Sequence, residues 1–367
     1  MSRKCLDHKL RLNNYRKNNT IMKKLFLFCT LCAAMLTAHA TVYSDTHGDF
    51  SWTLDTETGI LEFSGSGEIA NYSGSWSNYS SDVRTIIINP GITSLSTRIF
   101  QSYDSLRTVS LPEGLERIGS YAFWGCRVLS SCNLPSTLRK IGQNAFYACA
   151  LTSVVIPEGV DTLLSTFNQD TTLKSVSLPS TIEYMDQYVF YNTRIETVVL
   201  AEGIKTIPAD MFKRDYLKTI NIPSSFTSIP RNCFYMCAAL KNVTIAAGVD
   251  SICENAFYGC SSLESIGLPE GLKYIGSSAF RNAGIVSITI PSTVTKIEQY
   301  AFCCPNLQTV IIDNAELDLP ESAFYRCAKM KTVSFGNGIK SIGSYAFNDC
   351  TSLESVIFPS ACAANSI

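Results

Sequence analysis

Residues 111–126 read LPEGLERIGSYAFWGC, and residues 134–149 read LPSTLRKIGQNAFYAC. Two later stretches repeat this unit, LPEGLKYIGSSAFRNA at 268–283 and IPSTVTKIEQYAFCCP at 290–305. Each stretch contains one Phe, which we call the anchor Phe. The anchor Phe recurs every 21 to 23 residues, at Phe100, Phe123, Phe146, Phe167, Phe190, Phe212, Phe234, Phe257, Phe280, Phe302, Phe324 and Phe347. An internal period of this length is typical of a solenoid, in which successive coils stack on one another.

Each unit also contains a short strand in which two apolar residues are separated by one residue, as in Val109 and Leu111 or Val176 and Leu178. This spacing places both side chains on one face of a strand. In eight units a Pro follows the strand and ends it, because Pro has no N–H to donate. We therefore predict a repeat solenoid with a parallel sheet of about 13 short strands, the first at Ile86–Ile88. Turns and short helical or 3-10 segments are expected on the other face.

Composition and charge narrow the class of protein. The chain has 367 residues, of which 46% are hydrophobic and 17% charged, so a packed core is expected. The formal charge is −1, but the first 40 residues hold eight basic residues and one acidic residue. The remaining chain has a net charge of −8. Such a chain lacks the basic patch that binds nucleic acid or an anionic membrane, so we expect neither partner.

The amino-terminal region predicts export. From Met22 the chain has two Lys, an apolar stretch from Leu25 to Leu36, and an Ala-His-Ala cleavage motif ending at Ala40. A membrane anchor is the alternative, but the stretch is shorter than the roughly 18 residues that a spanning helix needs. No later segment predicts a transmembrane helix. The expected divisions are an upstream extension that is not native (1–21), a signal peptide (22–40), a β-rich cap (41–83), a solenoid of 12 repeats (84–359) and a short tail (360–367).

The unit I/L-P-x-x-φ-x-x-I-G-x-x-A-F-x-x-C-x-x-L-x-x-V resembles the BspA-type leucine-rich repeat of bacterial surface proteins, over residues 84–358. Residues 49–95 resemble the segment that commonly precedes such repeats. Within it, Phe50, Trp52 and Leu54 and then Leu61 and Phe63 alternate with polar residues, which predicts a hairpin that shields the first coil. The resemblance implies a secreted or cell-surface protein that acts in adhesion, with host matrix proteins or other cell-surface proteins as partners.

The repeats lack the residue types of most catalytic sites. The three His are His8, His39 and His47, and all precede the repeats, so a Ser-His-Asp or Cys-His site is not expected on the solenoid. Four Glu follow strand ends, where a solvated turn residue is the ordinary expectation, at Glu113, Glu158, Glu202 and Glu270. No phosphate-binding loop or metal motif occurs. We therefore predict a protein that is not an enzyme and that uses no cofactor and no metal.

Six cysteines stand three residues after an anchor Phe, at Cys126, Cys149, Cys237, Cys260, Cys327 and Cys350. An exported protein could oxidise them to disulfides between neighbouring coils. In-register residues of stacked coils, however, have parallel Cβ vectors about 4.8 Å apart, beyond the ~3.5–4.5 Å of a relaxed disulfide. We favour a ladder of buried thiols. A zinc site is disfavoured because Cys303-Cys304 and Cys233…Cys237 lack a second pair at finger-like spacing.

The outward side of the strands carries the candidate binding residues. The residue before the inward pair is Ser or Thr in eleven of twelve units, and charged residues of both signs stand beside it. The predicted binding residues are Arg107, Thr108, Lys174, Ser175, Lys218, Thr219 and Lys241. The hydroxyl column alone is also explained by β-propensity and by pairing between rungs. We expect a long, shallow, polar face without a pocket, which suits a macromolecule; a glycan-binding surface protein is the alternative.

The sequence of the carboxyl end predicts an interaction between copies of this protein. Residues 353–359 (LESVIFP) form a final strand, and only SACAANSI (360–367) follows it in this sequence. A solenoid end without a polar cap leaves a parallel edge open for pairing. We expect self-association through this edge.

Overall fold

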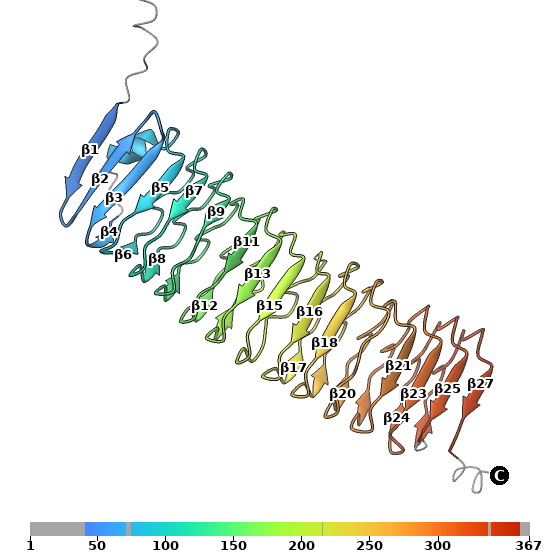
Figure 1. Cartoon of the computed structure of the whole chain (residues 1–367). Helices are drawn as coiled ribbons and strands as arrows, with labels where there is room; N and C mark the ends of the chain where they lie inside the picture. The colour runs from blue at the N-terminus through green and yellow to red at the C-terminus, as the bar shows by residue number, and fades with distance from the viewer. Residues whose placement is uncertain (1–40, 71–74, 215, 337–338, 360–367) are drawn as a thin grey trace, which may run out of the picture.

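The computed structural model describes residues 41–70, 75–214, 216–336 and 339–359, which form one elongated solenoid (Figure 1). The predicted parallel sheet is confirmed and runs along one side, which we call the strand face. The segments predicted as upstream extension, signal peptide and tail lie outside the described residues. The strands of this side are β1 (Val42–His47), β2 (Phe50–Asp55), β3 (Ile60–Gly65), β5 (Thr85–Ile88), β7 (Thr108–Ser110), β9 (Ser131–Cys132), β11 (Ser153–Val155), β13 (Ser175–Leu178), β15 (Thr197–Leu200), β16 (Thr219–Ile222), β18 (Asn242–Ile245), β21 (Ser287–Ile290), β23 (Thr309–Ile312), β25 (Thr332–Phe335) and β27 (Ser355–Ile357).

The strand face is a parallel ladder in register. Within each sheet the hydroxyl residue of one strand pairs with that of the next, as in Ser175 opposite Thr197 and Thr309 opposite Thr332, except that Thr219 lies opposite Asn242. The ladder divides into three sheets, with breaks between β9 and β11 and between β18 and β21. At the second break one coil has no assigned strand, and Gly267 stands in its outward position. A Gly in a strand interior weakens pairing because it has no side chain to pack.

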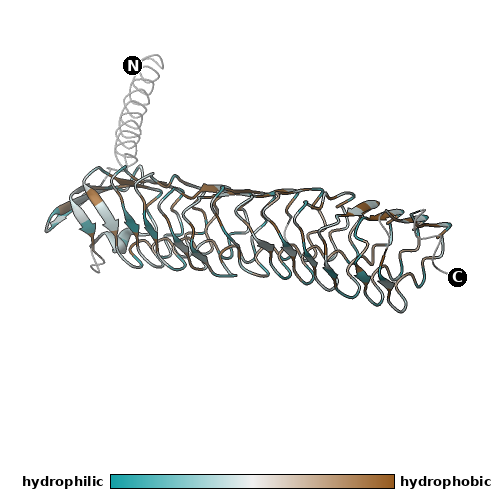
Figure 2. Ribbon diagram, turned by 90° about the horizontal axis from the view of Figure 1, so that it is seen from below, coloured by the Kyte–Doolittle hydropathy of each residue, from teal (hydrophilic) through white to brown (hydrophobic). Residues whose placement is uncertain are grey.

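A second row of shorter strands lies along the opposite side of the coils (Figure 2). Its members are β4 (Gly67–Ile69), β6 (Ile92–Leu95), β8 (Arg117–Ile118), β10 (Lys140–Ile141), β12 (Thr162–Leu163), β14 (Tyr184–Met185), β17 (Ser228–Ile229), β19 (Ser251–Ile252), β20 (Tyr274–Ile275), β22 (Lys296–Ile297), β24 (Asp318–Leu319) and β26 (Ser341–Ile342). The prediction of short helical or 3-10 segments on this side is wrong. In the part of the chain that the structure describes, the one helix is a 3-10 turn, η1 (Ser75–Tyr79), which precedes the first coil.

A third ladder of hydrogen bonds runs along the turns that carry the anchor Phe, which we call the turn edge. The N–H groups of Tyr121, Phe123 and Gly125 donate to carbonyls of the next coil at 2.8–2.9 Å. The residues two before and two after the anchor have positive φ, for example Tyr121 at 59° and Gly125 at 75°, with Tyr188 and Cys304 as exceptions. Residues of L configuration rarely adopt this conformation. Alternation in the sign of φ excludes a helix, which explains why turns replace the predicted helical segments.

The core is a stack of anchor Phe rings enclosed by the inward residues of both strand rows. The structure buries the anchor Phe side chains, except Phe347 in the last coil, which is half-buried. Neighbouring rings stack with centroids 5.2 to 6.3 Å apart. One continuous row of aromatic rings therefore runs through the solenoid.

The first coil is covered by the predicted hairpin. Strands β2 and β3 pair antiparallel, and β3 then pairs parallel with β5 of the first coil. Strand β1, which the sequence analysis did not identify, adds to the outer edge of β2. Trp76 from η1 packs its buried ring against Phe63 at 5.4 Å. At the other end Val356, Ile357 and Phe358 are exposed, and self-association there stays a prediction.

Candidate functional site

The structure places the predicted binding residues on the strand face, where each is exposed or half-buried. It also brings in a residue that the prediction omitted. The carboxylate of Glu196 lies between two of the lysines, 3.7 Å from Lys174 Nζ and 2.5 Å from Lys218 Nζ. The hydrogen bond from Lys218 and its charge hold the pKa of Glu196 below the usual value. Lys241 is on the next coil and forms no ion pair with any described residue.

Exposed apolar side chains also stand on this face, and two of them are close in the ladder to the coils that carry Lys174 and Lys218. Val155 is 69% exposed and Val199 is 54% exposed, and Ser177 lies between them in the ladder. The signal was present in the sequence as the runs SVVI (153–156) and TVVL (197–200), in which the outward position is apolar. The predicted shallow polar face is therefore interrupted by an apolar pair beside the lysines.

The strand face is also less flat than predicted. A depression of about 430 Å³ lies around the coil that has no assigned strand. An added Cβ at Gly267 would meet no atom within 4 Å. Ser287, Thr289 and Ile311 from the next coils line the other side. The absent side chain of Gly267 thus accounts for the depression.

The cysteines of the turn edge form a ladder of thiols that spans the coils. Each predicted ladder thiol donates to the carbonyl of the preceding anchor Phe, at Sγ···O distances of 2.9–3.3 Å. Cys304 makes the same bond to Phe280 at 2.9 Å, although it comes only two residues after its anchor. Burial raises the pKa of Cys126 to about 12, so the thiol is unreactive. The described cysteines are thiols, and Cys350 in the last coil is half-buried.

Asp170 takes the ladder position in the Phe167 coil, and its side chain is fully buried. Its carboxylate accepts the backbone N–H of Leu151 at 2.9 Å and the hydroxyl of Thr172 at 2.9 Å. Burial raises the pKa of Asp170 to about 6, although these hydrogen bonds act in the opposite direction. The interval from Phe146 to Phe167, 21 residues, is the shortest between neighbouring anchors. Leu151, whose N–H the carboxylate of Asp170 accepts, lies within this shortened interval. The sequence analysis did not single out Asp170.

Coil spacing changes in the middle of the solenoid. The ring centroids of Phe190 and Phe212 are 6.3 Å apart, and those of Phe212 and Phe234 are 6.0 Å apart. From Phe234 to Phe347 the spacing is 5.2–5.4 Å. In these coils, which we call the regular coils, the residue before the anchor is Cys233 in the first and Ala in the others. It is Val189 and Met211 in the wide coils, and all of these residues are buried. A larger side chain at this buried position requires more room between coils.

All three ladders weaken between the Phe190 coil and the Phe212 coil, which we call the wide junction. Strands β15 and β16 pair only at Thr197 and Thr219. The second strand row has no member between β14 and β17 among the described residues. At the turn edge, no backbone hydrogen bond joins Phe190 or Asn192 to the Phe212 coil, although the equivalent bonds resume from Phe212 to Cys233. Among the described residues, the wide junction is the one place where all three ladders of hydrogen bonds weaken between the same two coils.

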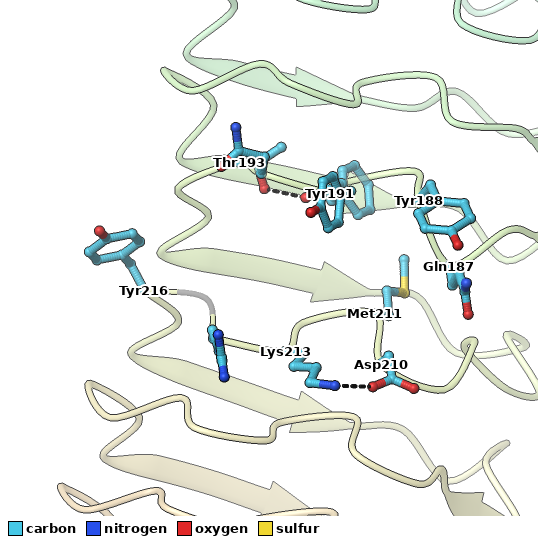
Figure 3. Close-up of a pocket in the computed structure, with 11 residues that line it drawn as sticks. Gln187, Tyr188, Tyr191, Thr193, Asp210, Met211, Lys213 and Tyr216 are labelled. Carbon is cyan, nitrogen blue, oxygen red and sulfur yellow. Dashed lines mark hydrogen bonds and ion pairs between the residues drawn. The ribbon is translucent and has the colours of Figure 1, made fainter.

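A groove of about 680 Å³ opens on the turn edge at the wide junction (Figure 3). Tyr188 and Tyr191 come from one coil, and Asp210 and Lys213 come from the next, joined to each other at 3.0 Å. Tyr216 stands at one end of the groove. This exposed group of tyrosines was not predicted from the sequence.

The described residues give little support for a metal site or for a membrane-spanning helix. Within them, no three His, Cys, Asp or Glu side chains lie close enough together to hold a metal ion. Their helical content includes nothing long and apolar enough to cross a bilayer. His47 belongs to strand β1, where its Nε2 lies 3.3 Å from the carboxylate of Asp45 and its ring contacts Trp76. This places it far along the chain from the Cys ladder and the groove.

A comparison with known protein families supports the repeat architecture of stacked coils. The model described as a BspA type leucine rich repeat region matches in overlapping segments that together span residues 73–354. The chain belongs to the BspA-type leucine-rich repeat family. A search of curated proteins found no match.

Several solved bacterial structures are similar to this BspA-type chain. A leucine-rich repeat protein from Eubacterium ventriosum is 20% identical, with 87% of this chain and 85% of that chain covered and a TM-score of 0.43. A leucine-rich repeat protein from Bacteroides ovatus is 22% identical, covering 82% and 100%, with a TM-score of 0.36. The pneumococcal vaccine antigen PcpA is 16% identical, covering 87% and 98%, with a TM-score of 0.42.

Proposed function

We propose that this BspA-type protein is an exported binding module that attaches to other proteins through its strand face and performs no catalysis. The family supports a repeat protein that binds partners, because stacked coils present an extended surface. The predicted signal peptide at 22–40 supports export to the cell surface or beyond. Host matrix proteins or other cell-surface proteins are the proposed partners, and adhesion is the proposed outcome.

One observation carries the proposal: the apolar pair Val155 and Val199 lies beside the charged group of Lys174, Glu196 and Lys218 on the same face. Protein interfaces combine an apolar centre with a polar, charged rim. The exposed valines supply apolar area that would be desolvated on binding. The charged side chains are exposed and would contribute mainly to orientation and association rate.

The test is binding of the purified protein to a panel of matrix proteins, with a glycan array beside it. Reversing three charges, Lys174→Glu, Lys218→Glu and Lys241→Glu, should weaken protein binding at least tenfold. A matched control reverses Lys140 and Lys296, which lie in strands of the second row, and Lys340, which directly precedes β26, and should bind normally. Thermal stability should change little in either, because surface substitutions usually cost less than about 0.5 kcal/mol.

A second pair of variants tests the apolar centre. Val155→Ser and Val199→Ser should together weaken binding while the charges stay in place. Unchanged binding in both the lysine and the valine variants would remove the strand face as the binding surface. Binding of glycans alone, lost in the same variants, would favour the glycan-binding alternative on this face.

A further inference from the structure

The groove at the wide junction has the composition of a ligand site, and it lies on the turn edge rather than on the strand face. Tyr188, Tyr191 and Tyr216 are 47%, 56% and 54% exposed, and all three line it. Tyr188 and Tyr191 meet edge to face with centroids 6.0 Å apart. Rings exposed to this degree on one groove offer flat apolar faces together with hydroxyl groups.

Polar groups line the rest of the groove. Gln187 and Asn192 carry side-chain amides, and Asn192 donates to Gln169 at 2.7 Å, which fixes its orientation. Asp210 accepts from Lys213 at 3.0 Å and from Asn232 at 3.2 Å. Amides and carboxylates held in this way offer both donors and acceptors. A ligand rich in hydroxyl groups matches such a lining.

Cations predominate among the described charged residues at the groove. Arg214 lines it, is exposed, and forms no ion pair with any described residue. Arg194 lies 6.0 Å from the ring centroid of Tyr216. Lys213 lies 5.3 Å from the ring centroid of Tyr235 in addition to its bond with Asp210. A guanidinium that forms no ion pair with the described residues is suited to a carboxylate, which it binds through two parallel hydrogen bonds.

The groove also results from departures from the repeat at this junction. Met211 replaces the usual Ala, the spacing of the anchor rings reaches 6.3 Å, and the turn-edge ladder lacks its cross-coil bonds there. In the regular coils the same edge is closed by hydrogen bonds such as those from Asn255 and Phe257 to the next coil. The wide junction therefore differs from the regular coils in its backbone hydrogen bonds as well as in its side chains.

We propose that this groove binds an acidic oligosaccharide, with the tyrosine rings against the sugar faces and Arg214 on a carboxylate of the sugar. The amides and Asp210 would bond to the sugar hydroxyls. Most of the side chains that line the groove are polar or carry a hydroxyl group, which favours a sugar over a peptide that would anchor an apolar side chain. This inference does not depend on the strand face, so the two proposals can fail separately.

The experiment measures binding of the full chain to trigalacturonate and sialyllactose, with maltotriose and lactose as neutral counterparts and hexaglutamate as a charge-only probe. We expect one of the acidic sugars to bind and the neutral sugars and hexaglutamate to bind at least tenfold more weakly. Tyr188→Ala and Arg214→Gln should each weaken binding of the acidic sugar at least tenfold. The strand-face lysine variant should bind it normally.

Matched controls exist because the repeat places similar residues elsewhere. Tyr345 stands two residues before its anchor, as Tyr188 does, and Arg326 stands two residues after its anchor, as Arg214 does. Tyr345→Ala and Arg326→Gln should leave binding unchanged. The proposal is overturned by absence of binding to both acidic sugars, by equal binding of hexaglutamate, or by equal losses in the groove and control variants.

Discussion

The coils around Phe190 and Phe212 and the coils from Phe234 to Phe347 follow the same repeat, yet they stack differently. In the second region each anchor is preceded by a small residue, the rings are 5.2–5.4 Å apart, and the ladder at the turn edge persists. In the first region Val189 and Met211 precede the anchors, the rings are 6.3 Å apart, and the cross-coil bonds are lost. Larger residues at one buried position therefore coincide with wider coil spacing and with a changed turn edge.

The largest predicted difference between the two regions is the loss of free energy of unfolding when an anchor Phe is replaced by Ala. Phe257→Ala should lower the free energy of unfolding by roughly 3–5 kcal/mol, because it removes a fully buried aromatic ring. Phe212→Ala should cost about 1 kcal/mol less, since its ring pairs are wider and such pairs contribute about 0.5–1.5 kcal/mol. Denaturant titration followed by circular dichroism measures both. Equal costs would contradict the effect of spacing, and a cost below about 1 kcal/mol for Phe257 would contradict its core role.

The second effect concerns Asp170, which replaces the ladder thiol where the regular coils have Cys. Its pKa is about 6 in the folded chain and ordinarily 3.8, so the folded state binds the proton more tightly. The free energy of unfolding should therefore fall as pH rises from 4 to 6, by up to about 3 kcal/mol. Relative to Asp170→Asn, the wild type should gain stability when pH is lowered from 7 to 4. Thermal unfolding of both proteins across this range is the measurement, and a constant difference would rule out the effect.

A smaller loss of stability is expected when Met, the residue that precedes the anchor Phe212, is placed at the equivalent position of a regular coil. Ala279→Met should destabilise the protein by about 1–3 kcal/mol, since it overpacks a closely stacked site. The crystal structure of the variant should show the Phe257–Phe280 spacing, now 5.4 Å, increased toward 6 Å. Ala279→Ser serves as a control of nearly the same size. If the variant keeps the original spacing, another feature of the wide junction sets the distance.

The sequence by itself determined the solenoid, because the period of the anchor Phe and the alternation within each strand are visible within a few tens of residues. Both patterns fix which side chains point inward, as Val176 and Leu178 do. The hairpin before the first coil was predicted for the same reason. The hydroxyl and lysine residues of the strand face followed from this alternation, and the exposed valines could have followed from it too.

Only the tertiary structure decided how far apart the coils lie and what the turn edge presents to solvent. Positive φ values at non-Gly residues such as Tyr121 arise from hydrogen bonds to the next coil, and no local residue preference predicts them. The groove lies where the buried Met211, a ring spacing of 6.3 Å and the loss of cross-coil hydrogen bonds from Phe190 and Asn192 occur together. Spacing between coils is set by the combined volume of buried side chains from two coils, a property that neither repeat contains alone.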